Sequence, residues 1–191
     1  MELINWKEHE LKGIKKMMKK LINKIRGKKD VYDLIKCGMK VGEHFWVGDN
    51  CTFDTSFCYL IQIGNNVTFS NNVQLITHDS SLYDFIHRTK LGMIIIDDWV
   101  FIGARTLILP GVHIGEGAIV AAGSLVTKNI PSMEVWGGYP AKKLCNRLEL
   151  EEKFLSNEYK FFGKEYISNN PVVYKENIIK ELKEKRKCYI I

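Results

Sequence analysis

An apolar residue recurs at every sixth position in the middle of the chain, and this period restricts the possible folds more than any other feature. The longest series is unbroken and consists of Ile96, Ile102, Ile108, Ile114, Val120 and Val126. Two shorter series with the same period come before it: Val41, Val47 and Phe53, then Ile63, Phe69 and Leu75. An α-helix would give a period near 3.6 and a simple strand a period of two, so neither explains the pattern.

A period of six is typical of a short strand followed by a tight turn, repeated along the chain. Each unit forms one side of a triangular prism, three units form one coil, and the apolar residue points into the prism. Gly, Asn and Asp gather between the apolar positions, because tight corners need positive φ angles or locally bonded side chains. Stacked coils bury their apolar residues only against neighbouring coils. The pattern therefore predicts a mainly β protein with a parallel β-helix as its central domain.

The hexads divide the chain into three segments. We predict a basic helical N-terminal extension over residues 1–37, the β-helix domain over 38–148, and a helical C-terminal extension over 149–191. A long loop of about residues 80–93 interrupts the hexads inside the domain. The five cysteines form no C-x-x-C pair, so the sequence indicates neither a zinc site nor a redox motif.

The net charge of +6 is carried by the first 30 residues, which hold ten Lys or Arg and four acidic side chains. A nucleic-acid-binding domain usually carries its basic charge on the folded body, so we exclude nucleic acid as a partner. The basic helix either covers the open end of the first coil, which we favour, or rests on an anionic membrane surface. The sequence has neither a secretory signal nor an apolar run of about 18 residues, and we expect a cytoplasmic protein.

Three groups of residues in the second half of the domain resemble the hexapeptide-repeat acyltransferases. They are Phe101-Ile102-Gly103-Ala104 with Leu109-Pro110-Gly111-Val112-His113-Ile114-Gly115, then Ala121-Ala122-Gly123-Ser124-Leu125-Val126-Thr127-Lys128, then Gly137-Gly138-Tyr139-Pro140-Ala141-Lys142. The branch resembled most is that of the galactoside and maltose O-acetyltransferases and the related surface-polysaccharide acetyltransferases. The resemblance covers about residues 38–148. It implies a left-handed β-helix, an exception to the right-handed crossover rule, with acetyl-CoA as the acyl donor and a homotrimer that holds it in a cleft between adjacent prisms.

Transfer of an acetyl group to a hydroxyl needs a base, because a sugar hydroxyl is a poor nucleophile at neutral pH. Histidine suits this task because its pKa lies near the working pH. His78 is the strongest candidate: it stands where the hexads stop and the loop begins, and the resembled family has its catalytic histidine at this place. Asp79 is our candidate for orienting His78, although neighbouring side chains on a strand point to opposite faces. The alternative for Asp79 is a corner aspartate that bonds its own backbone.

Asp54 and His87 are the candidates for contact with the acceptor. Asp54 stands where galactoside-type relatives have an asparagine near the acceptor, and a structural corner is the alternative. His87 lies inside the loop, which projects from the scaffold. His44 and His113 occupy outward corner positions of the hexads, and we expect both to be solvated.

Six residues stand at positions that contact coenzyme A in the resembled family: Ala104, Ala122, Thr127, Lys128, Lys142 and Lys143. The resemblance places the pantetheine arm beside the two alanines and the adenosine end beside the Thr–Lys pair. The two adjacent lysines follow the Gly-Gly-Tyr-Pro-Ala turn, where a cation suits the phosphates and where relatives often have an arginine. Simple packing of the alanines and solvation of the lysines are the alternatives.

These features predict an acetyl-CoA-dependent O-acetyltransferase that acts on a carbohydrate hydroxyl in surface polysaccharide synthesis. N-acylation of an amino sugar or nucleotide sugar is one alternative, and a non-catalytic β-helix scaffold is another. Zinc-dependent hydration of carbon dioxide would need three histidines on one metal. His78, His87 and His113 lack the coil spacing for that arrangement, so we predict no metal site.

Overall fold

The computed structural model describes residues 30–156, 161–162, 179–180, 182–183 and 189–190. The chain falls into two compact units, residues 1–147 and residues 148–191, and each is described by itself. Residues 1–29, which contain the predicted basic helix, lie outside the described residues, as does most of the predicted C-terminal extension.

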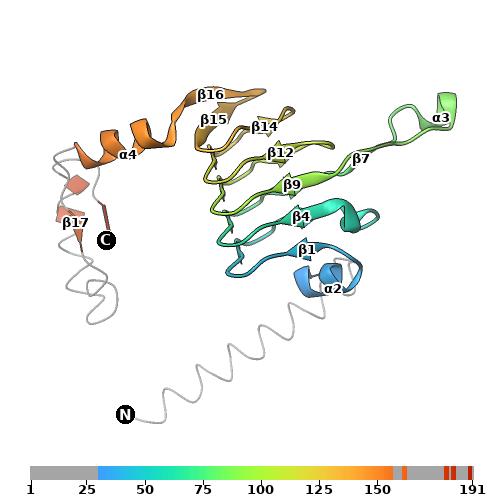
Figure 1. Cartoon of the computed structure of the whole chain (residues 1–191), viewed down its shortest axis with the longest axis horizontal. Coiled ribbons are helices and arrows are strands. Elements are labelled where there is room, and N and C mark those ends of the chain that lie inside the picture. The colour runs from blue at the N-terminus through green and yellow to red at the C-terminus, as the bar shows by residue number, and fades with distance from the viewer. Residues whose placement is uncertain (1–29, 157–160, 163–178, 181, 184–188, 191) are drawn as a thin grey trace, which may run out of the picture. The chain divides into compact units, whose positions relative to one another are not determined.

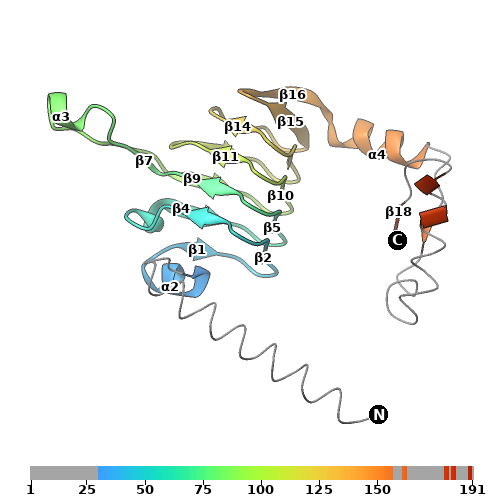
Figure 2. The same ribbon diagram turned by 180° about the vertical axis from the view of Figure 1, so that it is seen from behind.

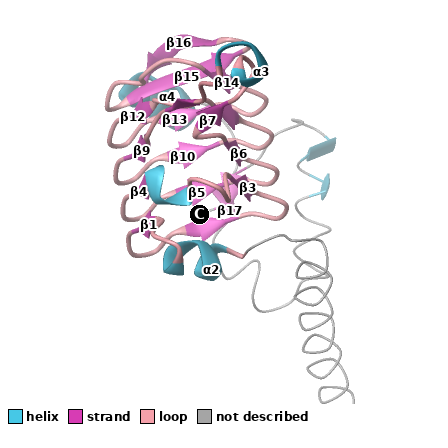
Figure 3. Ribbon diagram, turned by 90° about the vertical axis from the view of Figure 1, so that its right-hand side faces the viewer, coloured by secondary structure: helices cyan, strands magenta, loops and turns pink. Residues whose placement is uncertain are grey.

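Three sheets form the walls of a prism in the first unit (Figures 1 and 3). Sheet A contains β1 (Lys40–Val41), β4 (Ile61–Ile63), β9 (Ile94–Ile96) and β12 (His113–Ile114). Sheet B contains β2 (Trp46–Val47), β5 (Thr68–Phe69), β10 (Phe101–Ile102), β13 (Ile119–Val120), β15 (Glu134–Gly138) and β16 (Ala141–Asn146). Sheet C contains β3 (Thr52–Phe53), β6 (Gln74–Leu75), β11 (Leu107–Ile108) and β14 (Leu125–Val126). The chain passes from A to B to C and returns to A one coil higher. Within these three sheets, every strand except β16 runs parallel to its neighbours.

The pairing register places the hexad residues in columns inside the prism. In sheet B, Phe69 lies beside Ile102, and Ile102 lies beside Val120. All three side chains are fully buried. The buried columns of the other two sheets are Ile63, Ile96 and Ile114 in sheet A, and Leu75, Ile108 and Val126 in sheet C. The parallel β-helix predicted from the hexads is therefore confirmed.

Corner residues between the strands adopt left-handed backbone conformations. Asn66 (φ 55°) and Trp99 (φ 60°) do so between sheets A and B, and Asn72 (φ 61°) does so between sheets B and C. Asparagine tolerates this conformation better than most residues, whereas it is uncommon for a bulky tryptophan. Side chains also tie successive corners together, since the backbone N–H of Asn65 donates to Oδ1 of Asp98 on the next coil at 2.7 Å. The stacking of the coils is thus fixed at the corners as well as in the sheets.

Different elements cover the two ends of the prism. Beside the first coil, α2 (Val31–Lys36) buries Leu34, and the 3₁₀-helix η1 (Cys58–Leu60) buries Cys58. At the last coil, β15 extends sheet B and β16 turns back along it in antiparallel pairing. The indole of Trp136 packs against the core there. The hexad pattern did not predict this strand pair, because the period ends before β15.

An arm leaves the coils between β6 and β9 and extends away from them (Figures 1 and 2). It consists of β7 (His78–Asp79), α3 (Tyr83–Ile86) and β8 (Lys90–Leu91). The two strands pair in antiparallel fashion, with His78 opposite Leu91 and Asp79 opposite Lys90. The predicted loop is therefore a hairpin with a short helix at its tip, where the side chain of Phe85 is exposed.

The second unit contains few described residues. The helix α4 (Arg147–Leu155) begins at the boundary of this unit, and β17 (Phe161–Phe162) pairs in parallel with β18 (Tyr189–Ile190). A helix was predicted in this part of the chain, whereas a strand pair was not. None of the helices among the described residues has the length and apolar character that a membrane span requires. The division at residues 37 and 148 stays a prediction.

Candidate active site

His78 stands at the base of the arm, where the chain leaves the prism. The preceding residue, Thr77, is buried, and its carbonyl oxygen accepts a hydrogen bond from the N–H of Gly92 at 2.9 Å. This bond joins the two strands of the arm at their base. The side chain of His78 is 33% exposed, so a buried corner holds the imidazole while one side of it reaches solvent.

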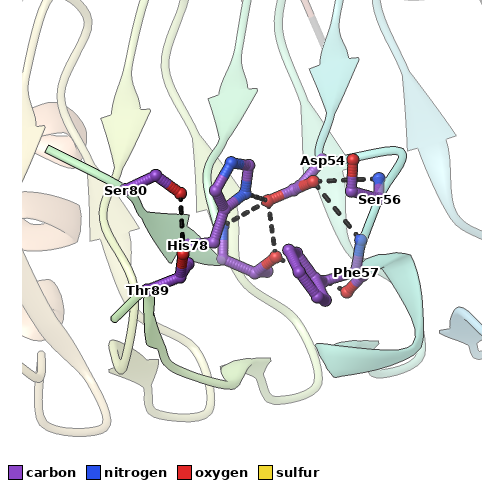
Figure 4. Close-up of polar contacts among 7 residues, drawn as sticks. Asp54, Ser56, Phe57, His78, Ser80 and Thr89 are labelled. Atoms are coloured by element: carbon purple, nitrogen blue, oxygen red, sulfur yellow. Dashed lines mark hydrogen bonds and ion pairs between the residues drawn. The ribbon is translucent and has the colours of Figure 1, made fainter. Parts of the chain in front are cut away.

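The carboxylate of Asp54, on the preceding coil, accepts hydrogen bonds from several groups around His78 (Figure 4). Its Oδ2 contacts Nδ1 of His78 and accepts from the N–H of Thr77 at 3.1 Å and from its hydroxyl at 2.7 Å. Its Oδ1 accepts from the N–H groups of Ser56 at 3.1 Å and Phe57 at 3.4 Å. Only 4% of the Asp54 side chain is exposed. The carboxylate is therefore fixed in position by two successive coils.

Electrostatics determine which nitrogen of His78 carries the hydrogen. Burial raises the pKa of Asp54, but the hydrogen bonds from His78, Thr77 and Ser56 outweigh this effect and hold the pKa below its usual value. Asp54 is thus ionised at neutral pH and can only accept hydrogen bonds. Nδ1 of His78 must then carry a hydrogen, so in the neutral imidazole Nε2 is the nitrogen that can accept a proton. A carboxylate that fixes the histidine tautomer in this way is a known feature of histidine bases.

The positions of Asp54 and Asp79 differ from those that we expected. Asp79 is exposed and its carboxylate accepts a hydrogen bond from the N–H of Ser81 at 2.9 Å. The hydrogen bonds from Ser81 also lower the pKa of Asp79. Because adjacent side chains of β7 leave opposite faces of the strand, Asp79 does not orient His78. The side chain that contacts the imidazole is that of Asp54, whose predicted contact with the acceptor stays a prediction.

The sequence did contain a signal for this pair. Phe53 and Leu75 are hexad residues, and the structure pairs them side by side in sheet C. The residues that follow them, including Asp54 and Thr77, must therefore meet at the same corner. The irregular stretch between Phe53 and Ile63 hid this register, because it breaks the hexad count.

An aromatic side chain that we did not predict lies beside the imidazole. The ring of Phe57 is 5.2 Å from the ring of His78, centre to centre, and tilted by 59°. Phe57 also contacts Tyr59 edge to face at 6.3 Å. Both rings come from the irregular stretch after β3, and that of Phe57 gives the candidate base an apolar neighbour.

Two other described histidines, His87 and His113, lie away from this group. His87 ends α3 in a left-handed conformation, and its ring contacts Tyr83 at the tip of the arm. His113 is exposed on sheet A, where its Nε2 lies 2.8 Å from Oδ2 of Asp97. Among the residues that the structure describes, no three His, Cys, Asp or Glu side chains are grouped as metal ligands.

The six residues expected to contact coenzyme A lie in three places, two beside sheet C and one on the last strand of sheet B. Ala104 and Ala122 lie at the edge between sheets B and C, where the carbonyl oxygen of Ala104 accepts the N–H of Gly123 at 2.7 Å. Thr127 and Lys128 follow β14, at the edge with sheet A that also holds His78. The remaining two, Lys142 and Lys143, lie on β16 opposite Gly137 and Trp136 of β15. A single chain therefore does not bring all six around one place.

The two adjacent lysines differ in their contacts. Nζ of Lys143 donates to Oε1 of Glu134 at 2.7 Å, and the other oxygen of Glu134 accepts from Nε1 of Trp136 at 2.7 Å. Lys142 is exposed, as is Lys128. The phosphates of coenzyme A would fit an exposed cation better than one that is already paired, because a paired lysine must first give up its carboxylate.

The comparisons with known proteins agree with this architecture. The sequence model of the family described as "Hexapeptide repeat of succinyl-transferase" matches residues 93–128. The maltose O-acetyltransferase of Clostridium difficile 630 has a TM-score of 0.51 and 34% identity, over 57% of this chain and 59% of that chain. Protein CapG of Staphylococcus aureus is 39% identical over 171 residues, which cover 86% of this chain and 98% of CapG. The chain belongs to the hexapeptide-repeat acyltransferase family.

A second solved hexapeptide-repeat protein, an acetyltransferase of Vibrio cholerae O1 biovar eltor, was crystallised in complex with acetyl-CoA. Its TM-score is 0.52 and its identity 28%, over 57% of this chain and 60% of that chain. The chain thus spans about three fifths of each of these two solved hexapeptide-repeat proteins and nearly all of CapG. The fold is the left-handed parallel β-helix of the family, as the resemblance implied.

Proposed function

We propose that this protein transfers an acetyl group from acetyl-CoA to a hydroxyl of a carbohydrate, with His78 as the general base. The observation that carries the proposal is the contact between the ionised Asp54 and Nδ1 of His78. In the neutral imidazole this contact makes Nε2 the acceptor nitrogen, which is the arrangement that a general base needs.

The reaction follows from this geometry. Nε2 of His78 takes the proton of the acceptor hydroxyl while the oxygen attacks the thioester carbonyl. Asp54 stabilises the imidazolium that forms. Collapse of the tetrahedral intermediate breaks the carbon–sulfur bond, and the proton on Nε2 passes to the departing thiolate. The products are the acetyl ester and coenzyme A, and the histidine returns to its starting state.

The donor assignment rests on family membership and on the cations of the chain. The Vibrio cholerae relative binds acetyl-CoA in its crystal structure. Lys128 and Lys142 are exposed cations, the first directly after β14 of sheet C and the second on β16 of sheet B. We propose that the chain acts as a homotrimer, in which the edge with Lys142 of one copy faces the edge with His78 and Lys128 of the next. The separation of the donor residues along one chain supports this arrangement.

The acceptor class is the finer part of the proposal. The Clostridium difficile relative is named as a maltose O-acetyltransferase, and we propose a sugar hydroxyl of a surface polysaccharide for this chain. The aromatic ring of Phe57 beside His78 supports a sugar, because aromatic faces offer apolar surface to ring C–H groups. N-acylation of an amino sugar would use the same base, and an acceptor panel separates the two reactions.

The test is the release of coenzyme A thiol from acetyl-CoA with free sugars, amino sugars, nucleotide sugars and glycolipids as acceptors. We expect acceptor-dependent release that falls by about a hundredfold or more in His78→Ala. His113→Ala is the matched control, because His113 also contacts an aspartate but lies on sheet A, and it should stay near the wild-type rate. Wild-type activity in His78→Ala would overturn the mechanism, and preferred acetylation of amines would overturn the acceptor class.

A further inference from the structure

The arm carries a second group of polar side chains on the same face as His78. The strand register places His78 opposite Leu91 and Asp79 opposite Lys90, so the next position places Ser80 opposite Thr89. Because side chains alternate along a strand, Ser80 and Thr89 share the face of His78, whereas Asp79 and Lys90 lie on the other face. Figure 4 shows Ser80 and Thr89 on one side of the imidazole and Phe57 on the opposite side.

The two hydroxyls form a pair with unused hydrogen-bonding capacity. Their oxygens are 3.1 Å apart, and either can be the donor. Each hydroxyl has one hydrogen and two lone pairs, so their mutual bond leaves one hydrogen and three lone pairs for other partners. Ser80 is exposed and Thr89 is half-buried. The pair can therefore donate to and accept from a ligand that lies against the arm.

The distance from His78 suits a small polyhydroxylated ligand. Residues two apart on a strand are separated by about 6.6 Å, and a hydrogen bond between oxygens spans about 2.8 Å at each end. An acceptor hydroxyl on Nε2 and a second hydroxyl on the Ser80–Thr89 pair would then lie within the width of one small ring. Leu91, which is 46% exposed opposite His78, offers apolar surface for the C–H groups between them.

We propose that Ser80 and Thr89 form an acceptor subsite that binds a second hydroxyl beside the one that is acetylated. The inference rests on the proposed acetyl transfer and deepens it, because it restricts the acceptor to a sugar or related ring with at least two hydroxyls. An acceptor with one isolated hydroxyl or amine would leave the pair without a ligand. Specificity thus comes from the arm, while the chemistry comes from the corner below it.

The experiment compares Ser80→Ala, Thr89→Val and the double variant with the wild type. The acceptor is the best sugar of the panel together with its monodeoxy analogues, and kcat and KM are measured for both substrates. Each single variant should lower kcat/KM for the sugar about five- to tenfold and leave KM for acetyl-CoA unchanged. The monodeoxy analogue that lacks the hydroxyl bound by the pair should lower kcat/KM of the wild type by the same factor. With this analogue, the variants should be no slower than the wild type. Thr68→Val, which removes a hydroxyl from sheet B, is the matched control.

Two results would overturn the subsite alone. Unchanged sugar kinetics in the double variant would show that the pair does not contact the acceptor. The variants could instead lose the same factor in kcat/KM with every deoxy analogue and also melt at a lower temperature. That result would show that the Ser80–Thr89 hydrogen bond only stabilises the pairing of the two arm strands. Wild-type enzyme that acetylates only amines or single hydroxyls would overturn the subsite and the proposed function together. If the wild-type enzyme acetylates sugars but the variants behave like the wild type, the subsite fails and the proposed function stands.

Discussion

Oδ2 of Asp54 contacts Nδ1 of His78, although the two residues are 24 positions apart in the sequence and belong to different turns of the β-helix. The contact exists because Phe53 pairs with Leu75, so the C-terminal ends of β3 and β6 lie at the same corner. The buried Thr77 donates to the same carboxylate oxygen and fixes its position. The corner therefore gives the imidazole its tautomer, its orientation and a countercharge.

Asp54→Asn should reduce kcat/KM by about a hundredfold or more, because the amide keeps the shape of the side chain but cannot stabilise the imidazolium. The measurement is thiol release from acetyl-CoA with a saturating acceptor. Asp97→Asn is the matched control, since it changes the partner of the exposed His113. A near wild-type rate in Asp54→Asn would show that His78 needs no carboxylate.

The lowered pKa of Asp54 predicts how stability depends on pH. A carboxylate whose pKa is depressed by folding stabilises the protein fully above its unfolded pKa of about 4. That stability should decline as pH falls further and vanish below the folded pKa. Urea unfolding of wild type and Asp54→Asn between neutral and acidic pH measures it. The two proteins should differ most near neutral pH and converge in acid, and a constant difference would contradict the prediction.

The two lysines of β16 should differ in their effect on the donor. Lys142→Ala should raise KM for acetyl-CoA about three- to tenfold, and added salt should reduce the effect, because an exposed cation acts on the phosphates through a screened field. Lys143→Ala should change KM less, since Glu134 already accepts a hydrogen bond from Lys143. The reverse order would show that Lys143 leaves Glu134 when the donor binds.

The hexad period predicted the strands, their inward residues and the parallel stacking, because one short-range rule governs all of these features. Ile102 is an example, since its burial follows from its phase alone. The position of His78 at the end of the hexads was also visible in the sequence, with the help of a family resemblance. The strands, their inward residues and the position of His78 could be predicted because each depends on residues close in the sequence or on the repeating hexad.

Features that depend on contacts between coils were harder to predict. The orienting role of Asp54 needs the register between two coils, and the irregular stretch before Ile61 conceals it. The arm was expected as a loop, because the ordered hairpin rests on local pairs such as His78 with Leu91, for which the hexads give no signal. The Glu134–Lys143 bond depends on the antiparallel strand β16, which follows the end of the repeats.

The corner shared by Asp54 and Thr77 links activity to the integrity of the solenoid at one end. Stacked repeats are held only by their neighbours, so such proteins can unravel inward from a terminal repeat. Asp54 belongs to the first of the stacked coils, whereas His78 follows the second. Fraying of that single terminal coil would separate the two side chains while the remaining coils kept their hydrogen bonds. With His78 as the proposed base, acetyl transfer would then be lost before most of the β structure, while the protein is still largely folded.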